Sequence, residues 1–138
     1  MSLKELVEVK DEGRVIARYV PAELAWKDGL NFFSPDEDFI QVGTWGYDKD
    51  KQLLAHIHNK VPRHVDWTQE VLFIHSGSLK AHIYNRAEEL VEEWVATTGD
   101  LLVMLGGGHG YTILEDGTKV LEIKNGPYVG AEQDRRRI

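Results

Sequence analysis

The fold class is decided by the stretch Glu70-Val71-Leu72-Phe73-Ile74-His75-Ser76-Gly77, which continues as Ser78-Leu79-Lys80-Ala81-His82-Ile83-Tyr84. Its first half is almost entirely apolar, which is typical of a β-strand covered on both faces. Its second half alternates apolar and polar residues, which is typical of a strand with one face in a core. The Ser-Gly-Ser step between the halves is a turn signal. The stretch therefore predicts two β-strands joined by a turn.

Similar short segments lie on both sides of this stretch, separated by turn signals rich in glycine, asparagine and aspartate. The further strands that we expect are 3–9, 14–20, 40–47, 52–58, 88–95, 101–105, 111–114 and 118–124, with one helical turn at 22–26. The step Asp116-Gly117 predicts a hairpin between the last two of them. About nine to eleven strands and almost no helix predict an all-β domain. A meander of this length must close into a barrel or divide into two packed sheets.

The composition is that of one soluble globular domain over residues 1–138. The absence of cysteine excludes disulfides and thiolate chemistry. A net charge of −7 argues against nucleic acid as a partner. No segment resembles a signal peptide or a membrane span, so we expect a cytoplasmic protein with no membrane partner. We interpret the basic run 135–137, in the C-terminal tail 125–138, as solvated.

Two histidines, His56 and His58, are spaced for metal binding if residues 52–58 form a strand. Side chains two residues apart on a strand point to the same face, roughly 6.5–7 Å apart between Cα atoms. Two imidazoles in this arrangement can converge on one ion. The alternative is that Leu53, Ala55 and Ile57 face the core while both histidines face water. A metal site therefore needs further ligands.

Glu70 and His109 are the further ligands that the sequence offers. A carboxylate at the start of a buried strand is costly unless it is paired or bound to a metal. His109 follows the triplet Gly106-Gly107-Gly108, and glycines permit close approach of the backbone to a ligand. A set of histidines with one glutamate suits divalent Fe, Mn, Ni, Zn or Cu, and the composition does not distinguish among these metals.

These segments resemble the cupin family over roughly residues 40–124. The run from Glu70 to Gly77 matches the glutamate-to-glycine spacing of the first cupin motif, and the run from Gly99 to His109 is similar to the second motif. The resemblance implies a single cupin domain, a double-stranded β-helix or jelly-roll barrel of two antiparallel sheets. It also implies a homodimer, with the strands at 3–20 added to a sheet or to the dimer interface.

The chain departs from the cupin motifs in ways that leave two ligand sets open. At the family's spacing before Glu70 stands His64-Val65-Asp66, whereas the complete His-X-His lies earlier, at 56–58. In the second motif Leu105 replaces a proline, His109 comes one residue early and Ile113 replaces an asparagine. The favoured metal set is His56, His58, Glu70 and His109. The alternative replaces His56 with His64, or recruits Asp66.

Other polar and aromatic residues are candidates for smaller roles. His75 has the opposite parity to Glu70 and is expected to point away from the site, and His82 is expected on a solvent face. Arg63 is a candidate for binding a carboxylate or phosphate of the substrate, or else a surface residue. Trp67 is a candidate for the mouth of a pocket, or else a core residue.

Three functions follow from the resemblance. The first is a metal-dependent enzyme of the dioxygenase or isomerase type, whose ion binds and polarises a small oxygen-bearing substrate. The second is a metal-free isomerase or epimerase of sugar nucleotides, in which His58 and Tyr111 are the first candidates for proton transfer. The third is a ligand-binding module without catalysis. The sequence leaves open whether the chain is an enzyme.

Overall fold

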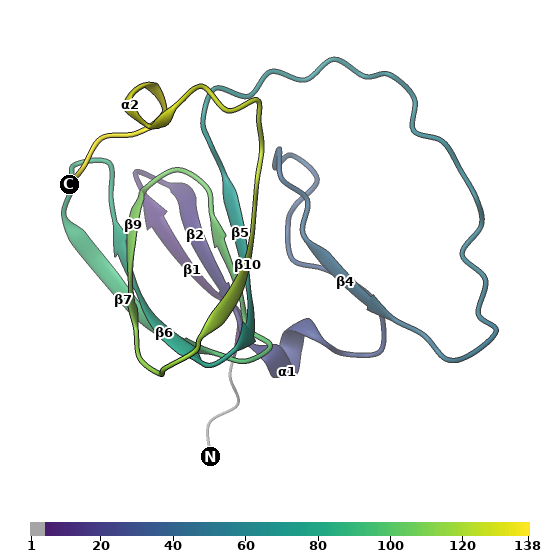
Figure 1. Cartoon of the computed structure of the whole chain (residues 1–138). Helices are drawn as coiled ribbons and strands as arrows, with labels where there is room; N and C mark the ends of the chain where they lie inside the picture. Colours follow the sequence, from purple (N-terminus) through teal and green to yellow (C-terminus); the bar gives the residue numbers. More distant parts are fainter. Residues whose placement is uncertain (1–4) are drawn as a thin grey trace.

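A computed structural model gives the fold and describes residues 5–138, which contain ten β-strands and two four-residue helices (Figure 1). In chain order these are β1 (Val7–Asp11), β2 (Arg14–Val20), α1 (Ala22–Ala25), β3 (Gly29–Phe32), β4 (Gly43–Gly46), β5 (Glu70–Ser76), β6 (Ser78–Tyr84), β7 (Leu90–Thr97), β8 (Leu101–Met104), β9 (Gly108–Ile113), β10 (Lys119–Lys124) and α2 (Ala131–Asp134). The predicted all-β class is therefore confirmed. Of the strand expected at 3–9, Leu3 and Lys4 lie outside the described residues.

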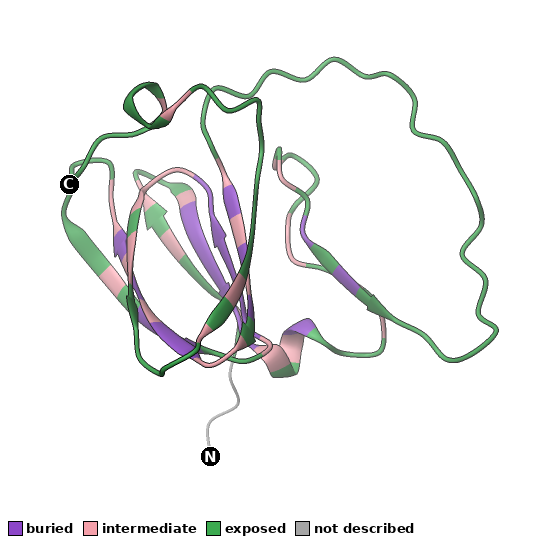
Figure 2. Cartoon of the chain, in the orientation of Figure 1, coloured by how far each residue is buried: buried purple, intermediate pink, exposed green. Residues whose placement is uncertain are grey.

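Two antiparallel sheets make up the body of the protein. One has the strand order β1-β2-β8-β5-β10, and the other has the order β7-β6-β9. Their inner faces share one apolar core, because side chains from both sheets pack in the same cluster. Buried residues concentrate on these facing strands (Figure 2). The core consists of Ile16, Ala17, Tyr19, Leu72, Ile74, Leu79, Ala81, Ile83, Trp94, Ala96, Leu102 and Met104.

The strands at the centre of the prediction lie where the sequence places them. β5 and β6 cover the stretch that decided the fold class, and β7 confirms the strand expected at 88–95. The turn at Gly77 has φ +92°, and a Cβ at this position would collide with Thr118. This position therefore requires glycine for both its backbone conformation and its space.

Two local predictions are wrong. β9 and β10 flank Asp116-Gly117 but do not form a hairpin, because β9 pairs with β6 and β10 pairs with β5. The connection crosses from one sheet to the other. Residues 52–58 form no strand, and they lie within an exposed segment without secondary structure, residues 47–69, which we call the arm. The arm leaves the body of the protein and returns to it at β5 (Figure 1).

A two-stranded ribbon of β3 and β4 precedes the arm. Residues near this ribbon cover the outer face of the larger sheet, where Phe33 and Val42 pack in a second apolar cluster with Val103 of β8. The ribbon itself leaves Leu30, Phe32 and Trp45 more than half exposed. A two-stranded ribbon is only marginally stable on its own, so the exposure of these three apolar side chains requires an explanation.

Two buried polar residues join elements that are distant in sequence. Asp100 is 1% exposed and accepts hydrogen bonds from the Tyr19 hydroxyl at 2.5 Å and from the Ala22 N–H at 2.7 Å. Arg18 is 3% exposed and forms ion pairs with Glu8 and with Asp38, each at 2.6 Å.

Within residues 5–138, neither helix is long and apolar enough to span a lipid bilayer.

Candidate functional site

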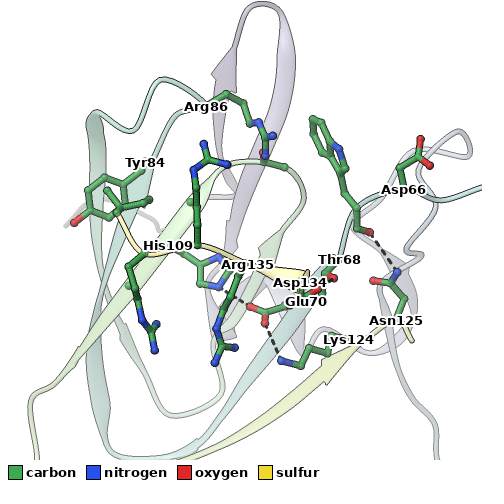
Figure 3. Close-up of a pocket in the computed structure, with 18 of the residues that line it drawn as sticks. Asp66, Thr68, Glu70, Tyr84, Arg86, His109, Lys124, Asn125, Asp134 and Arg135 are labelled. Carbon is green, nitrogen blue, oxygen red and sulfur yellow. Dashed lines mark hydrogen bonds and ion pairs between the residues drawn. The ribbon is translucent and has the colours of Figure 1, made fainter. Parts of the chain in front are cut away.

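An open cavity of about 1040 Å³ lies at the end of the two-sheet body where β5 begins. Its lining comes from β5, β9 and β10, from the end of the arm and from the C-terminal tail (Figure 3). The cavity therefore collects residues from four separate stretches of the sequence, within 65–70, 84–88, 106–111 and 122–138.

Glu70 lies at the bottom of this cavity because of its position in β5. The side chains of Glu70, Leu72 and Ile74 alternate onto the inner face and are all buried. The antiparallel register pairs Glu70 with Lys124 of β10 and with Met104 of β8. A carboxylate that is 7% exposed needs compensating partners, as the sequence indicated.

The partner of Glu70 is His109, as Figure 3 shows. Glu70 Oε2 lies 2.7 Å from His109 Nε2, and the Lys124 ammonium lies 3.5 Å from Oε1. The contact with His109 is close but lacks hydrogen-bond geometry, so the buried Oε2 of Glu70 has no hydrogen-bond partner. Hydrogen bonds in unliganded active sites are often poorly aligned and tighten when a ligand binds.

A second carboxylate, Glu122, shares this environment. The hydrogen-bonding contact with His109 is the main cause that holds the pKa of Glu70 well below its usual range, with further help from Glu122 and Lys124 against the opposing effect of burial. Burial, followed by the contact with Glu70, raises the pKa of Glu122. The site thus holds one firmly ionised carboxylate beside one that takes up a proton more readily.

Tyr111 completes the group from the next inward position of β9. Its ring lies 5.5 Å from that of His109, and its hydroxyl is buried without a hydrogen-bond partner. Burial, together with the charges of Glu70 and Glu122, raises the pKa of this phenol, so it stays protonated. A buried hydroxyl without a partner is uncommon in proteins, so this group is a candidate contact for a ligand.

Trp67 and Arg86 form one wall of the opening. The Arg86 guanidinium lies 4.4 Å from the centre of the Trp67 ring, within the range of a cation–π contact. The indole packs directly on Gly106, where any Cβ would collide with it. Trp67 lies at the mouth of this cavity, and its role as a substrate contact stays a prediction.

The C-terminal tail lies over the same opening. Thr68 donates a short hydrogen bond to Asp134, Arg136 forms an ion pair with Glu88 at 3.0 Å, and Ile138 packs against Gly108. Figure 3 shows Arg135 over the cavity. The interpretation of residues 135–137 as a solvated tail is therefore incomplete, because these exposed arginines line the opening.

The structure brings together only half of the favoured metal set. His56 and His58 have rings 4.9 Å apart, but both are exposed on the arm, away from Glu70 and His109. His64 is also exposed and contacts Asp66 at 2.8 Å. Within residues 5–138 no three His, Asp or Glu side chains converge as metal ligands. In this arrangement of one chain, the residues present do not fit the predicted ion.

Some of the remaining predicted residues lie at the cavity, and others lie away from it. Arg63 lies on the arm beside a separate shallow depression, and Asp66 lines the main cavity. His75 is exposed and points away from the Glu70 face, as expected. His82 lies on the face of β6 opposite the core residues Ala81 and Ile83, as the solvent-face prediction expects, and its ring contacts Glu93 at 2.5 Å and Thr112 at 2.9 Å there.

Sequence reasoning missed four lining groups, and only some of them had a signal. Glu122 and Lys124 share a face of β10, and this parity would have placed them beside Glu70 once the β5–β10 pairing was known. Arg86 and the tail carry no local pattern that predicts their place.

The chain matches no protein-family model, and comparisons with curated proteins and with solved structures find no match.

Proposed function

We propose that the chain is an enzyme of the isomerase or epimerase type, which moves a proton on a small carbonyl compound bound in the cavity. The two sheets would form the jelly-roll barrel of a cupin, with the site at one end. The observation that carries the proposal is the close contact between the buried Glu70 and the more exposed His109, both of which line the cavity with Tyr111 and its unpartnered hydroxyl.

When a ligand closes the site, the Glu70 carboxylate would orient the imidazole of His109. The ionised carboxylate would then favour a proton on the nearby Nε2 and leave the lone pair on Nδ1. An imidazole held in one tautomer by a carboxylate is the arrangement of a general base. Its task here is to accept a proton from the carbon next to the substrate carbonyl.

Tyr111 supplies the matching acid. The electron pair of the broken C–H bond moves onto the carbonyl oxygen, and the Tyr111 hydroxyl donates a hydrogen bond to the developing oxyanion. In an isomerisation His109 then returns its proton on the same face to the neighbouring carbon, while the oxygen-bound proton shifts through solvent; in an epimerisation solvent water supplies a proton to the opposite face and His109 releases its own to solvent. Atoms and electrons balance without any redox partner, which suits epimerisation or isomerisation.

The test is exchange of substrate C–H protons with solvent deuterium, followed by NMR. The panel comprises α-keto acids, ketoses and nucleotide-linked keto sugars. We expect exchange with at least one of these compounds, a loss of at least about 100-fold in His109→Gln and a similar loss in Tyr111→Phe. His75→Gln, an exposed histidine on the opposite face of β5, is the control and should retain full exchange.

Absence of exchange across the panel would refute the enzymatic proposal. Thermal stabilisation by one of the same compounds without exchange would instead identify a ligand-binding module. The metal-binding function stays a prediction, because it requires His56 and His58 to reach Glu70 and His109. Elemental analysis of untagged protein tests it, with about one transition metal per chain that is lost in Glu70→Ala as the supporting result.

A further inference from the structure

The two sheets leave unpaired edges next to the cavity. Within the described residues, β9 pairs only with β6 and β10 pairs only with β5. β9 and β10 follow each other in the chain, and each is the edge strand of a different sheet. Their free edges lie on the same side of the body (Figure 1). Exposed strand edges of this kind are templates for another strand.

The arm carries the sequence of a strand but pairs with nothing in this chain. Residues 52–58 alternate in the manner of a strand, yet Leu54, on the same face as His56 and His58, is 82% exposed. Loops longer than about 12–15 residues without secondary structure are uncommon in compact domains. The arm therefore resembles a strand whose partner is not in the same chain.

The face of the arm that bears the histidines matches the inward face of β9. On β9 that face carries His109, Tyr111 and then Ile113, which is 57% exposed. On the arm, the residues of matching parity are His58, His56 and Leu54 in the reverse direction. Antiparallel pairing of His58 with His109 would therefore also place Leu54 opposite Ile113, four positions further along each strand.

We propose that residues 52–58 of a second copy of this chain pair antiparallel with the free edge of β9, so that each site is built from two chains. In the dimer, His56 and His58 of the arm would enter the cavity beside Glu70 and Tyr111. The two buried oxygens that lack aligned partners, Glu70 Oε2 and the Tyr111 hydroxyl, would then gain imidazole groups within reach. The proposal adds residues to the site of the proposed function, and it rests on that function only for their chemical role.

The exposed apolar area favours a second copy as the occupant. Each aromatic side chain presents about 150–250 Å² when fully exposed. Phe32, Phe39, Trp45 and Tyr47 are 40–60% exposed, so together they leave roughly 300–500 Å² uncovered. With the exposed aliphatic residues of the ribbon and arm, this approaches the ~800 Å² per partner of a stable interface.

If the arm instead paired with β9 of its own chain, less of the exposed apolar surface would be covered. It would cover the edge of β9 but leave Leu30 and Trp45 of the ribbon without a partner, since these residues lie before the arm. In a two-fold dimer every contact occurs twice, so the arm of each copy would cover the β9 edge of the other, and the two ribbons would be available to the same interface.

The chain lacks cysteine, which permits a clean cross-linking test. In the proposed register Leu54 and Ile113 are directly opposed, at a Cα separation of about 4.5–5.5 Å that a disulfide can bridge. We expect the double variant Leu54→Cys/Ile113→Cys to form a covalent dimer on oxidation, visible on a non-reducing gel. The matched control is Leu53→Cys/Ile113→Cys, whose arm cysteine has the opposite parity and should not cross-link.

Single-cysteine chains complete the test. When Leu54→Cys and Ile113→Cys chains with different tags are co-expressed, the disulfide should join one chain of each kind. An intramolecular disulfide in the double variant would overturn the proposal in favour of a fold-back. A monomer in light scattering with no disulfide would also overturn it. None of these readouts depends on turnover, so failure of this proposal and failure of the proposed function are distinguishable.

Discussion

Replacing Glu70 with glutamine should change the stability of the protein in a pH-dependent way. The carboxyl of Glu70 has its pKa lowered from 4.5 to about 2 by its contacts with His109, Glu122 and Lys124. A carboxyl whose pKa is lower in the folded state stabilises the fold above its unfolded pKa and loses that contribution as the pH falls. The interval from 4.5 to about 2 corresponds to at most about 3 kcal/mol.

Glu122 reduces this figure. Its pKa is raised, partly by the charge of Glu70, so its ionised form is disfavoured in the folded protein. Glu70→Gln removes that charge and relieves the repulsion, which offsets part of the loss. We therefore expect the variant to be less stable than the wild type by about 2 kcal/mol at pH 7. The difference should shrink between pH 5 and pH 2, where the wild-type carboxylate becomes protonated.

Urea unfolding followed by tryptophan fluorescence at pH 7, 5 and 3 measures this difference. The control is Glu88→Gln, which removes an exposed ion pair with Arg136 and should cost less than about 1 kcal/mol at every pH. A deficit for Glu70→Gln that is constant from pH 7 to pH 3 would refute the reasoning. So would a variant that is more stable than the wild type at pH 7.

Three further substitutions test the packing around the site. Asp100→Ala should lower the free energy of unfolding by about 3 kcal/mol in urea, because it strands the buried Tyr19 hydroxyl and a main-chain N–H. Arg18→Ala should cost about 3 kcal/mol in the same assay, since it leaves two carboxylates without their shared guanidinium. Gly77→Ala should lower the melting temperature by several degrees, because of its positive φ and the collision with Thr118, whereas Gly13→Ala meets no neighbour and isolates the backbone contribution.

The sequence predicts strands well where one residue pattern determines burial. β5 and β6 follow directly from an apolar run and an alternating run, so their place in the core needed no knowledge of their partners. The pairing of β9 and β10 could not be predicted in this way. A turn at Asp116-Gly117 fits either a hairpin or a crossing between sheets, and only the partner strands decide which of these forms.

The site shows the same division. The cost of burying a carboxylate singled out Glu70, and the glycine triplet drew attention to His109, so half of the site was visible in the sequence. The arginines of the tail were not, because an exposed basic run has the same pattern whether it is solvated or lies over a cavity. Their place depends on Ile138 reaching Gly108, a contact between the end of the chain and β9.

The arm is the segment in which the sequence pattern and the single chain disagree most. The alternation of apolar and polar residues at 52–58 predicts a strand. Such a pattern depends on what the two faces of the strand contact, and not on the backbone alone. A strand needs a partner edge, and the body of the protein has such an edge at β9, with the same order of polar and apolar residues on its inner face. Both observations have a common explanation if the missing strand of each body is the arm of another copy. The sequence would then describe the dimer more completely than it describes the single chain, and the two histidines on the arm would belong to a site that exists only when two chains meet.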